Sequence, residues 1–270
     1  MKLRIIYGTL IVSVFVAMPV VGPLAQIIGG GICIMLSVYE LASAFKKHEH
    51  SKPSLILCYL YIIASLVSYY YVGFFGLFFN IGLFSMALLS RPIIYENINQ
   101  NDVASSIFLL IYPCTLGLFF PLTGYLPGNY APIAMLAIGM YASIIDIMAF
   151  CVGSLIGKHK LIVRISPNKT VEGAIGGFSG GIIAGLFFFY LIQPSFQINI
   201  SLMDYIIMGI FCGVFAQLGD LTASALKRFT EIKDFSNLLP GHGGILDRLD
   251  SLLFCGPIIF SYIYLIAKLG

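Results

Sequence analysis

Apolar segments of nearly constant length recur along the whole sequence, separated by short polar turns. Each is about 17–22 residues long, enough for a helix to cross a hydrocarbon core about 30 Å thick. Nine can be marked, at 4–21, 24–45, 54–72, 73–90, 105–122, 131–151, 174–193, 203–223 and 251–268. Segments such as 206–216 do not alternate between polar and apolar residues, as the strands of a membrane barrel do. We therefore predict an all-α, polytopic integral membrane protein.

The composition excludes an ordinary soluble globule. Of 270 residues, 59% are hydrophobic and only 10% are charged, and the mean hydropathy is +0.96. Soluble domains carry about 25% charged residues. The first segment follows Lys2 and Arg4 and could be a signal peptide, but no polar mature domain follows it, so we assign it as a helix. We divide the chain into an N-terminal multi-span region, 1–130, and a C-terminal catalytic region, 131–270.

Lysine and arginine residues predict the orientation of the chain. With a cytoplasmic N-terminus and nine spans, fourteen of the fifteen basic residues fall on the cytoplasmic side, where such residues concentrate. They are Lys2, Arg4, Lys46, Lys47, Lys52, Arg91, Lys158, Lys160, Arg164, Lys169, Lys227, Arg228, Lys233 and Arg248, and Lys268 is the exception. We expect a multi-pass protein of the cell (inner or plasma) membrane with its chemistry on the cytoplasmic side.

Two sets of small residues have structural interpretations. The six cysteines lie in apolar segments without C-x-x-C or zinc-like spacing, so we interpret them as core residues rather than disulfides or ligands. Gly173, Gly177, Gly181 and Gly185 recur every four residues and would let another helix approach closely. This glycine stripe could serve packing within the chain or a homodimer.

Charged residues concentrate between 220 and 250. Asp220, Ser224 and Lys227 have the spacing of one helix face, and Asp247 and Asp250 have the spacing of another. The glycine-rich turn at 240–244 lies between them and can bring backbone amides close to a ligand. Carboxylates, basic groups and glycines together favour a polyphosphate bridged to the protein by Mg²⁺. A membrane-adjacent charge network without a ligand is the alternative.

Ionisable residues within the spans extend this interpretation. Such a residue costs about 2.5–3.5 kcal/mol on insertion scales unless it is compensated. We interpret Glu40 as the structural partner of a nearby lysine or arginine, and we assign Asp146 to the site. Asp220 and Asp247 come from separate helices and would repel each other unless a cation lay between them, which favours a divalent ion.

The stretch resembles the signature of the phosphatidate cytidylyltransferase (CDP-diacylglycerol synthase) family. It contains, in order, S-x-x-K-R at 224–228, K-D at 233–234, P-x-H-G-G at 240–244 and D-R-x-D at 247–250. Upstream, G-D-L at 219–221, S-P-N-K-T-V-E-G at 166–173, and Asp146 with Gly153, Gly157 and Lys158 also resemble family elements. The resemblance covers about residues 140–252. Phe150 stands where the family usually has tyrosine, so a hydroxyl is missing there.

This resemblance implies an activity: CTP and phosphatidate react to give CDP-diacylglycerol and pyrophosphate, in phospholipid biosynthesis, with Mg²⁺ as cofactor and a second cation left open. It implies that the metal ligands are Asp220 and Asp247, then Asp250 and Asp146, and that Asp220, Asp247, Lys227 and Arg248 are catalytic. The implied substrate-binding residues are Ser224, Arg228, Lys233, His242, Gly243, Gly244, Lys169, Thr170 and Lys158. His242 could donate to a phosphate or cap the turn. The implied partners are CTP, membrane phosphatidate and the bilayer, and no nucleic acid.

Three alternatives stay open at this point. A secondary transporter would also carry charges at membrane depth, but it should contain internal repeats, and the 220–250 cluster has no second copy. A polyprenol kinase would use CTP and release CDP rather than pyrophosphate. A CDP-archaeol synthase would differ only in its preference for an ether lipid.

Overall fold

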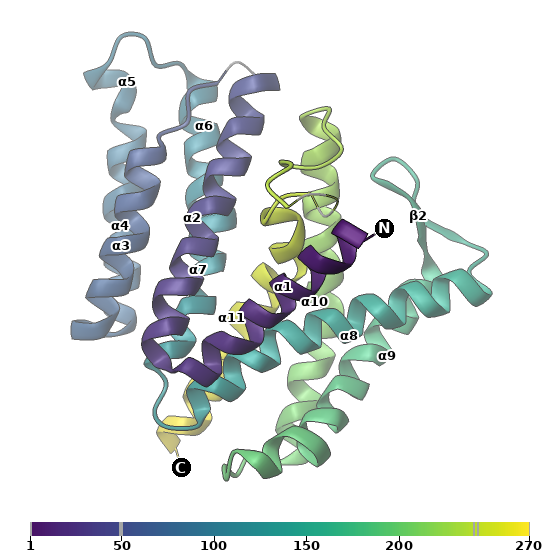
Figure 1. Ribbon diagram of the computed structural model, residues 1–270. Coiled ribbons are helices and arrows are strands. Elements are labelled where there is room, and N and C mark those ends of the chain that lie inside the picture. Colours follow the sequence, from purple (N-terminus) through teal and green to yellow (C-terminus); the bar gives the residue numbers. More distant parts are fainter. Residues whose placement is uncertain (1, 49–50, 240, 242, 270) are drawn as a thin grey trace.

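The chain is almost entirely helical in the computed structural model, which describes residues 2–48, 51–239, 241 and 243–269 (Figure 1). The helices are α1 (Lys2–Val21), α2 (Pro23–His48), α3 (Leu55–Val72), α4 (Phe74–Leu89), α5 (Arg91–Ile94), α6 (Gln100–Leu109), α7 (Leu116–Leu122), α8 (Tyr130–Ile156), α9 (Val171–Phe187), α10 (Leu202–Phe229) and α11 (Leu246–Leu269). Within the described ranges, eight helical segments are long and apolar enough to cross a membrane. The predicted all-α polytopic class is confirmed.

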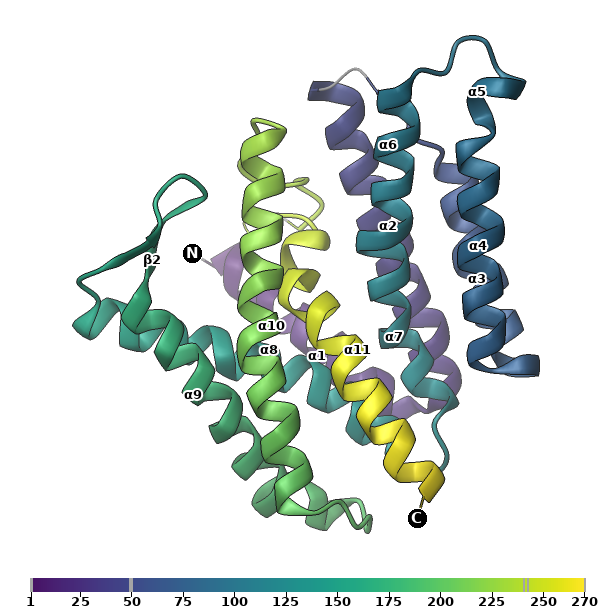
Figure 2. The ribbon, with the colours of Figure 1, turned by 180° about the vertical axis from the view of Figure 1, so that it is seen from behind.

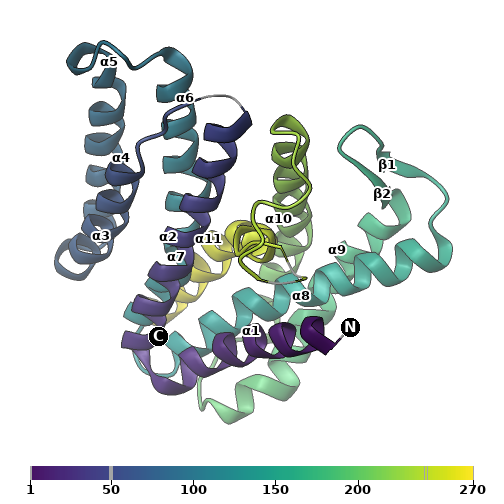
Figure 3. The ribbon, with the colours of Figure 1, turned by 45° about the horizontal axis from the view of Figure 1, so that its top comes forward.

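The first predicted span, 4–21, corresponds to α1, a helix of 20 residues. It is not among the eight segments. It lies obliquely along α8 and contacts both α2 and α8 (Figure 3). The Phe15 ring of α1 stacks on Phe120 of α7 at 5.4 Å between centroids. The first helix is thus packed onto α2, α7 and α8.

Two features interrupt the predicted spans. The single segment predicted at 105–122 consists of α6 and α7 joined by a π-helical turn, Leu110–Thr115, that contains Pro113. Proline has no N–H to donate and its ring crowds the preceding turn, so the wider turn accommodates it. The division predicted between 72 and 73 is confirmed, because Gly73 separates α3 from α4 with a φ of 61°, which glycine adopts without strain.

The C-terminal helices are longer than predicted. Helix α10 continues to Phe229 rather than ending near 223, and α11 begins at Leu246 rather than 251. Asp220 therefore lies two turns inside α10, not at its end, while Asp247 lies in the first turn of α11. The polar residues that follow Asp220 extend the helix beyond its apolar part, which hydropathy alone does not detect.

A small antiparallel hairpin follows α8, in a stretch expected to be a loop. Strand β1 (Lys160–Ile162) pairs with β2 (Ser166–Thr170), and the hairpin lies beside α10 at the end of the bundle (Figure 2). The loop after α2, helix α5 and the loop after α10 lie at the same end. Most of the basic residues that define the predicted orientation therefore lie together at one end of the bundle. We call this the basic end, and it carries Lys46, Lys52, Arg91, Lys160 and Lys233.

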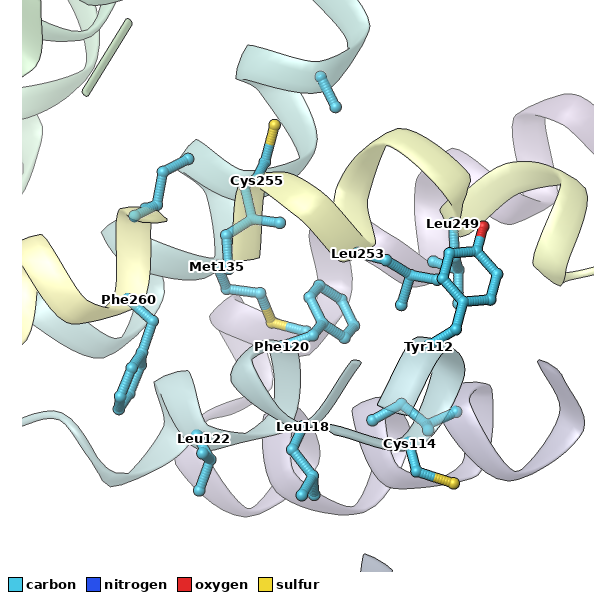
Figure 4. Close-up of a cluster of buried hydrophobic side chains, with 14 of the residues drawn as sticks. Tyr112, Cys114, Leu118, Phe120, Leu122, Met135, Leu249, Leu253, Cys255 and Phe260 are labelled. Atoms are coloured by element: carbon cyan, nitrogen blue, oxygen red, sulfur yellow. The ribbon is translucent and has the colours of Figure 1, made fainter. Parts of the chain in front are cut away.

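The buried core connects the two halves of the chain through α11, which packs against α2, α7, α8 and α10. Figure 4 shows part of this core, with side chains from Tyr112, Cys114, Leu118, Phe120, Leu122, Met135, Leu249, Leu253, Cys255 and Phe260. Four of the six free cysteines, Cys58, Cys114, Cys212 and Cys255, are buried as predicted, whereas Cys33 is half-buried and Cys151 is exposed, so the core interpretation is wrong for Cys151. Helix α8 begins at Tyr130, and the division of the chain into two regions at this point stays a prediction.

The glycine stripe is used for packing within the chain. A Cβ at Gly173 would lie 2.8 Å from the carbonyl oxygen of Ala149 in α8, and one at Gly181 would lie 2.1 Å from that of Gly209 in α10. Both distances are shorter than a carbon–oxygen contact allows. Helix α9 therefore touches the backbones of α8 and α10 directly, and these contacts place β2, which precedes α9, next to α10.

Candidate active site

Four predicted metal-binding carboxylates line one cavity of about 450 Å³ where α8, α9, α10, α11 and β2 meet. Asp146 comes from α8, Asp220 from α10, and Asp247 and Asp250 from α11. Lys169 and Thr170 of β2 line the same cavity. Residues from both polar stretches therefore line the same cavity.

Lys169 and Asp220 form the central ion pair of the cavity. The Nζ of Lys169 lies 2.5 Å from Oδ2 of Asp220, and the two side chains are 26% and 31% exposed. Ser224, one turn further along α10, is only marginally within hydrogen-bonding distance of Asp220, at 3.5 Å. The hairpin thus supplies a cation to the α10 carboxylate, so Asp220 is neutralised within the chain.

Both carboxylate oxygens of Asp247 have partners within the chain. Oδ1 pairs with Nζ of Lys227 at 2.9 Å, and Oδ2 accepts hydrogen bonds from the backbone N–H groups of Phe235 and Gly244, each at 2.9 Å. The Asp247 side chain is only 6% exposed. This carboxylate therefore holds the loop between α10 and α11 in its folded form, and the repulsion expected between Asp220 and Asp247 is relieved by a lysine on each.

Asp146 and Asp250 are bound differently, through Ser251 at the start of α11. The Ser251 hydroxyl donates to Oδ2 of Asp146 at 3.3 Å, and the Ser251 N–H donates to Oδ1 of Asp250 at 2.7 Å. Among the described residues, neither aspartate forms an ion pair with a basic side chain. These two carboxylates therefore have the most freedom to bind an incoming cation.

The carboxylates of the cavity suit a magnesium ion only if a bound substrate supplies further oxygen ligands. In the described part of the chain, no group of three or more His, Cys, Asp or Glu side chains is arranged to hold a metal by itself. Mg²⁺ in nucleotide-dependent sites is usually bound by one or two carboxylates, with water and substrate phosphates completing its shell. Asp146, Asp220 and Asp250 offer carboxylates of this kind around one cavity.

Glu40, in the N-terminal half of the chain, binds the loop between α10 and α11 and the start of α11. Its carboxylate accepts hydrogen bonds from the Ser236 hydroxyl at 2.6 Å and from the N–H groups of Ile245 and Leu246 at 2.9 and 2.8 Å. The expected pairing with a lysine or arginine is wrong for the described residues, because the partners of Glu40 are a hydroxyl and a helix N-terminus, which attracts negative charge.

The glycine pair of the predicted turn has two separate roles. Gly243 has a φ of 78°, a backbone conformation that favours glycine. A Cβ at Gly244 would lie 2.5 Å from Oε2 of Glu40, so this position must be glycine for the carboxylate to approach. Both glycines therefore shape the protein around Glu40 and Asp247.

The remaining predicted residues are spread over the basic end. Thr170 caps α9, with its hydroxyl accepting from the Gly173 N–H at 3.1 Å. Lys158 is exposed, and its N–H donates to Glu172. Lys233 is exposed in the loop after α10, and Arg248 is exposed in the first turn of α11. His242 lies outside the described residues. Arg228 lines a different cavity from the aspartates.

Two contributors were missed by sequence reasoning. Ser251 directly follows the D-R-x-D motif, and nothing in the pattern indicated that its hydroxyl reaches Asp146. Gln217 lies one turn before Asp220, and its amide donates to the Ala174 carbonyl at 3.1 Å, which ties α10 to α9 beside the cavity. A polar side chain in an apolar run was the signal available for Gln217.

The fold and the cavity define an integral membrane protein of the all-α class that presents carboxylates and a lysine in one pocket near the basic end. The sequence profile of the cytidylyltransferase family matches residues 2–266, and the chain belongs to that family. The family resemblance based on the motifs is therefore confirmed.

Relatives of similar length support the same assignment. The phosphatidate cytidylyltransferase of Bacillus subtilis is 34% identical over 268 residues, covering 96% of each chain. That of Staphylococcus aureus strain COL is 32% identical over 264 residues, covering 96% of this chain and 97% of its own. That of Staphylococcus saprophyticus is 46% identical over 114 residues, 42% of each chain.

Proposed function

We propose that this protein transfers the cytidylyl group of CTP to phosphatidate, giving CDP-diacylglycerol and pyrophosphate. The observation that carries the proposal is the cavity in which Asp146, Asp220, Asp250 and Lys169 meet, in a chain that aligns over 96% of its length with a phosphatidate cytidylyltransferase. Such a cavity in a membrane protein can bind a water-soluble nucleotide and a lipid headgroup next to each other.

In the proposed reaction an oxygen of the lipid phosphate attacks the α-phosphorus of CTP. The bond from that phosphorus to the oxygen bridging to the β-phosphorus breaks, and pyrophosphate leaves with the electron pair. Positioning and charge neutralisation dominate such transfers, because the protein needs to supply little covalent chemistry. Lys169 carries the positive charge for a phosphate oxygen, and a phosphate that takes Lys169 as its partner frees the Asp220 carboxylate.

Mg²⁺ is the proposed cofactor, with Asp220, Asp250 and Asp146 as its protein ligands and Asp247 as a further candidate. When bound, the ion neutralises charge on the phosphates. Asp247 supports the site mainly by holding Lys227 and the loop amides in place. The Ser251 hydroxyl orients Asp146, and its N–H orients Asp250, so one residue aligns two carboxylates.

We propose that the site faces the cytoplasm. The basic end carries Lys46, Lys52, Arg91, Lys160 and Lys233, and basic residues near membrane spans concentrate on the cytoplasmic side. CTP is a cytoplasmic nucleotide, so an enzyme that uses it requires this orientation.

The decisive experiment follows labelled phosphate through the reaction. Purified protein is incubated with phosphatidate, Mg²⁺ and CTP labelled either in the α- or the γ-phosphate. We expect the α-label in the lipid and the γ-label in pyrophosphate. Transfer of the γ-label to the lipid with release of CDP would identify a kinase. Movement of intact CTP across the vesicle membrane without release of pyrophosphate would identify a transporter.

Two further arms test the substrate and the metal. A diether phosphate offered beside phosphatidate separates this activity from that of a CDP-archaeol synthase, and we expect phosphatidate to be preferred. Excess EDTA should abolish turnover, and added Mg²⁺ should restore it. Full turnover in excess EDTA would remove the metal from the proposal and leave the cytidylyl transfer intact.

A further inference from the structure

A second cavity lies across α10 from the acidic one. It has a volume of about 800 Å³, within the roughly 300–1,000 Å³ typical of ligand sites. Its walls come from the end of α2, one side of α6 and the last two turns of α10, and its rim includes the tip of the hairpin. Among the residues of α10, Thr222, Ala225 and Phe229 line this second cavity, whereas Gln217 and Asp220 line the acidic one.

The walls of this second cavity are mostly apolar, with Asn101, Ser105 and Thr222 as their uncharged polar residues. Phe45 of α2 and Phe108 of α6 lie edge to face at 5.9 Å between centroids, and Leu226 and Phe229 of α10 line the opposite side. Phe229 is 69% exposed. None of the described residues that line the cavity is acidic. The surface is therefore suited to hydrocarbon chains.

Two arginines lie at the rim of the same cavity, Arg164 at the hairpin tip and Arg228 on α10. Both are exposed, and within the described chain neither forms an ion pair with a carboxylate. The Nε of Arg228 donates to the carbonyl oxygen of Ile165 at 3.3 Å, which holds the hairpin tip against α10. Arginine side chains bind phosphate oxygens with a rigid, planar set of donors.

The position of this cavity along the helices matches that of lipid headgroups. Phe45 lies near the end of the span Pro23–Lys47, Asn101 near the start of Gln100–Tyr125, and Phe229 at the end of Leu202–Phe229. All three ends lie at the basic end of the bundle (Figures 1 and 2). Basic pockets between spans at this depth are typical sites for anionic lipid headgroups.

We infer that this cavity binds an anionic phospholipid of the bilayer, with its phosphodiester on Arg164 and Arg228 and an acyl chain against Phe45 and Phe108. The occupant is not the reacting phosphatidate, because the body of α10, about 10 Å across with its side chains, separates the cavity from Asp220 and Lys169. The acidic cavity and this lipid site therefore share α10 as a common wall. A lipid bound here braces the hairpin that supplies Lys169.

The absence of tryptophan from the chain provides a direct test. Phe108→Trp places a single fluorophore in the wall of the lipid site, and Ile93→Trp places one on α5, 87% exposed and outside it. Each variant is reconstituted in phosphatidylcholine that contains a small fraction of brominated phosphatidylglycerol, phosphatidylcholine or phosphatidate. Bromine quenches the fluorophore only when the lipid lies against it.

We expect phosphatidylglycerol to associate with the Phe108→Trp reporter about tenfold more strongly than phosphatidylcholine, because two basic residues face its phosphate. The Ile93→Trp reporter should show no such preference. Adding Arg164→Gln to the Phe108→Trp reporter should remove most of the preference, and so should high salt. A reporter variant that does not fold is replaced by Phe229→Trp, on the opposite wall.

Three results would overturn the inference: equal quenching by phosphatidylglycerol and phosphatidylcholine, an unchanged preference in Arg164→Gln, or selection of phosphatidate over phosphatidylglycerol. The last would make the cavity a substrate subsite. Since the readout is lipid association and not turnover, each of these results would leave the proposed cytidylyl transfer standing.

Discussion

The carboxylate of Glu40 accepts a hydrogen bond from the backbone N–H of Leu246 at 2.8 Å, across 206 residues of sequence. Glu40 is 2% exposed. It belongs to the first half of the chain, whereas the motif it supports lies in the second. The N-terminal spans therefore help to build the site.

Replacement of Glu40 by alanine should destabilise the protein. The change removes three hydrogen bonds to a charged acceptor and leaves buried donors unpaired, so we expect a loss of about 2–4 kcal/mol in the free energy of unfolding. Thermal unfolding in detergent measures it, with Glu96→Ala, an exposed acid outside the site, as control. Equal stability of the two variants would contradict the proposed role of Glu40.

Gly244→Ala should lower both stability and turnover. The added Cβ would lie 2.5 Å from the Glu40 carboxylate, which must then move and release the amides of Ile245 and Leu246. Gly82→Ala is the matched control, since nothing lies within 4 Å of its Cβ position and alanine favours the helix. We expect a lower melting temperature only for Gly244→Ala, by thermal unfolding.

Asp220→Asn and Asp247→Asn should lose turnover for different reasons. Asp220 is partly exposed in the cavity, so its variant should stay folded and lack activity at any Mg²⁺ concentration. Asp247 is buried and paired with Lys227, and breaking a buried pair costs about 3–5 kcal/mol, so its variant should also unfold more easily. Near wild-type turnover with unchanged Mg²⁺ dependence in folded protein would exclude a ligand role for either residue.

Lys169→Ala should lower kcat/KM by about 30- to 1000-fold, since a charge-assisted bond to a phosphate is worth on the order of 2–4 kcal/mol. Lys46→Ala, at the same end but outside both cavities, is the control. The rates are measured at matched amounts of folded protein. Comparable activity in the two variants would place phosphate binding elsewhere.

The proposed orientation is tested with single cysteines at Lys160 and Asn237, in a background that lacks the six natural cysteines. Both positions are exposed and lie at the basic end. We expect an impermeant thiol reagent to label them only after the membrane is permeabilised. Labelling of either position in intact cells would contradict the proposed orientation.

Much of the fold could be predicted because lipid imposes strict length and hydropathy on a span. The ends of α10 and α11 could not, since the polar residues that extend them are stabilised by tertiary contacts such as Lys227 with Asp247. The hairpin was missed because its strands, of three and five residues, are too short to show a periodic pattern.

The motifs pointed to several residues that line one cavity, but not to the partner that each of them bonds. Spacing placed Asp247 and Asp250 on one helix face, yet it could not indicate that Asp247 is committed to loop amides while Asp250 lies beside Asp146. The partner of Glu40 was also beyond prediction, because it depends on how α2 packs against α11. Arg228 lies within the signature and lines the other cavity.

The direct backbone contact between Gly181 and Gly209 has a consequence for the chemistry at the other end of the same helices. With no side chains between them, the main chains of α9 and α10 lie in direct contact at this point. Lys169 precedes α9 and Asp220 belongs to α10. The contact between the two helices therefore helps to set the relative position of Lys169 and Asp220. Because a misplacement of about 1 Å can cost a hundredfold in rate, the proposed positioning of Lys169 and Asp220 depends on two glycines that lie outside the cavity.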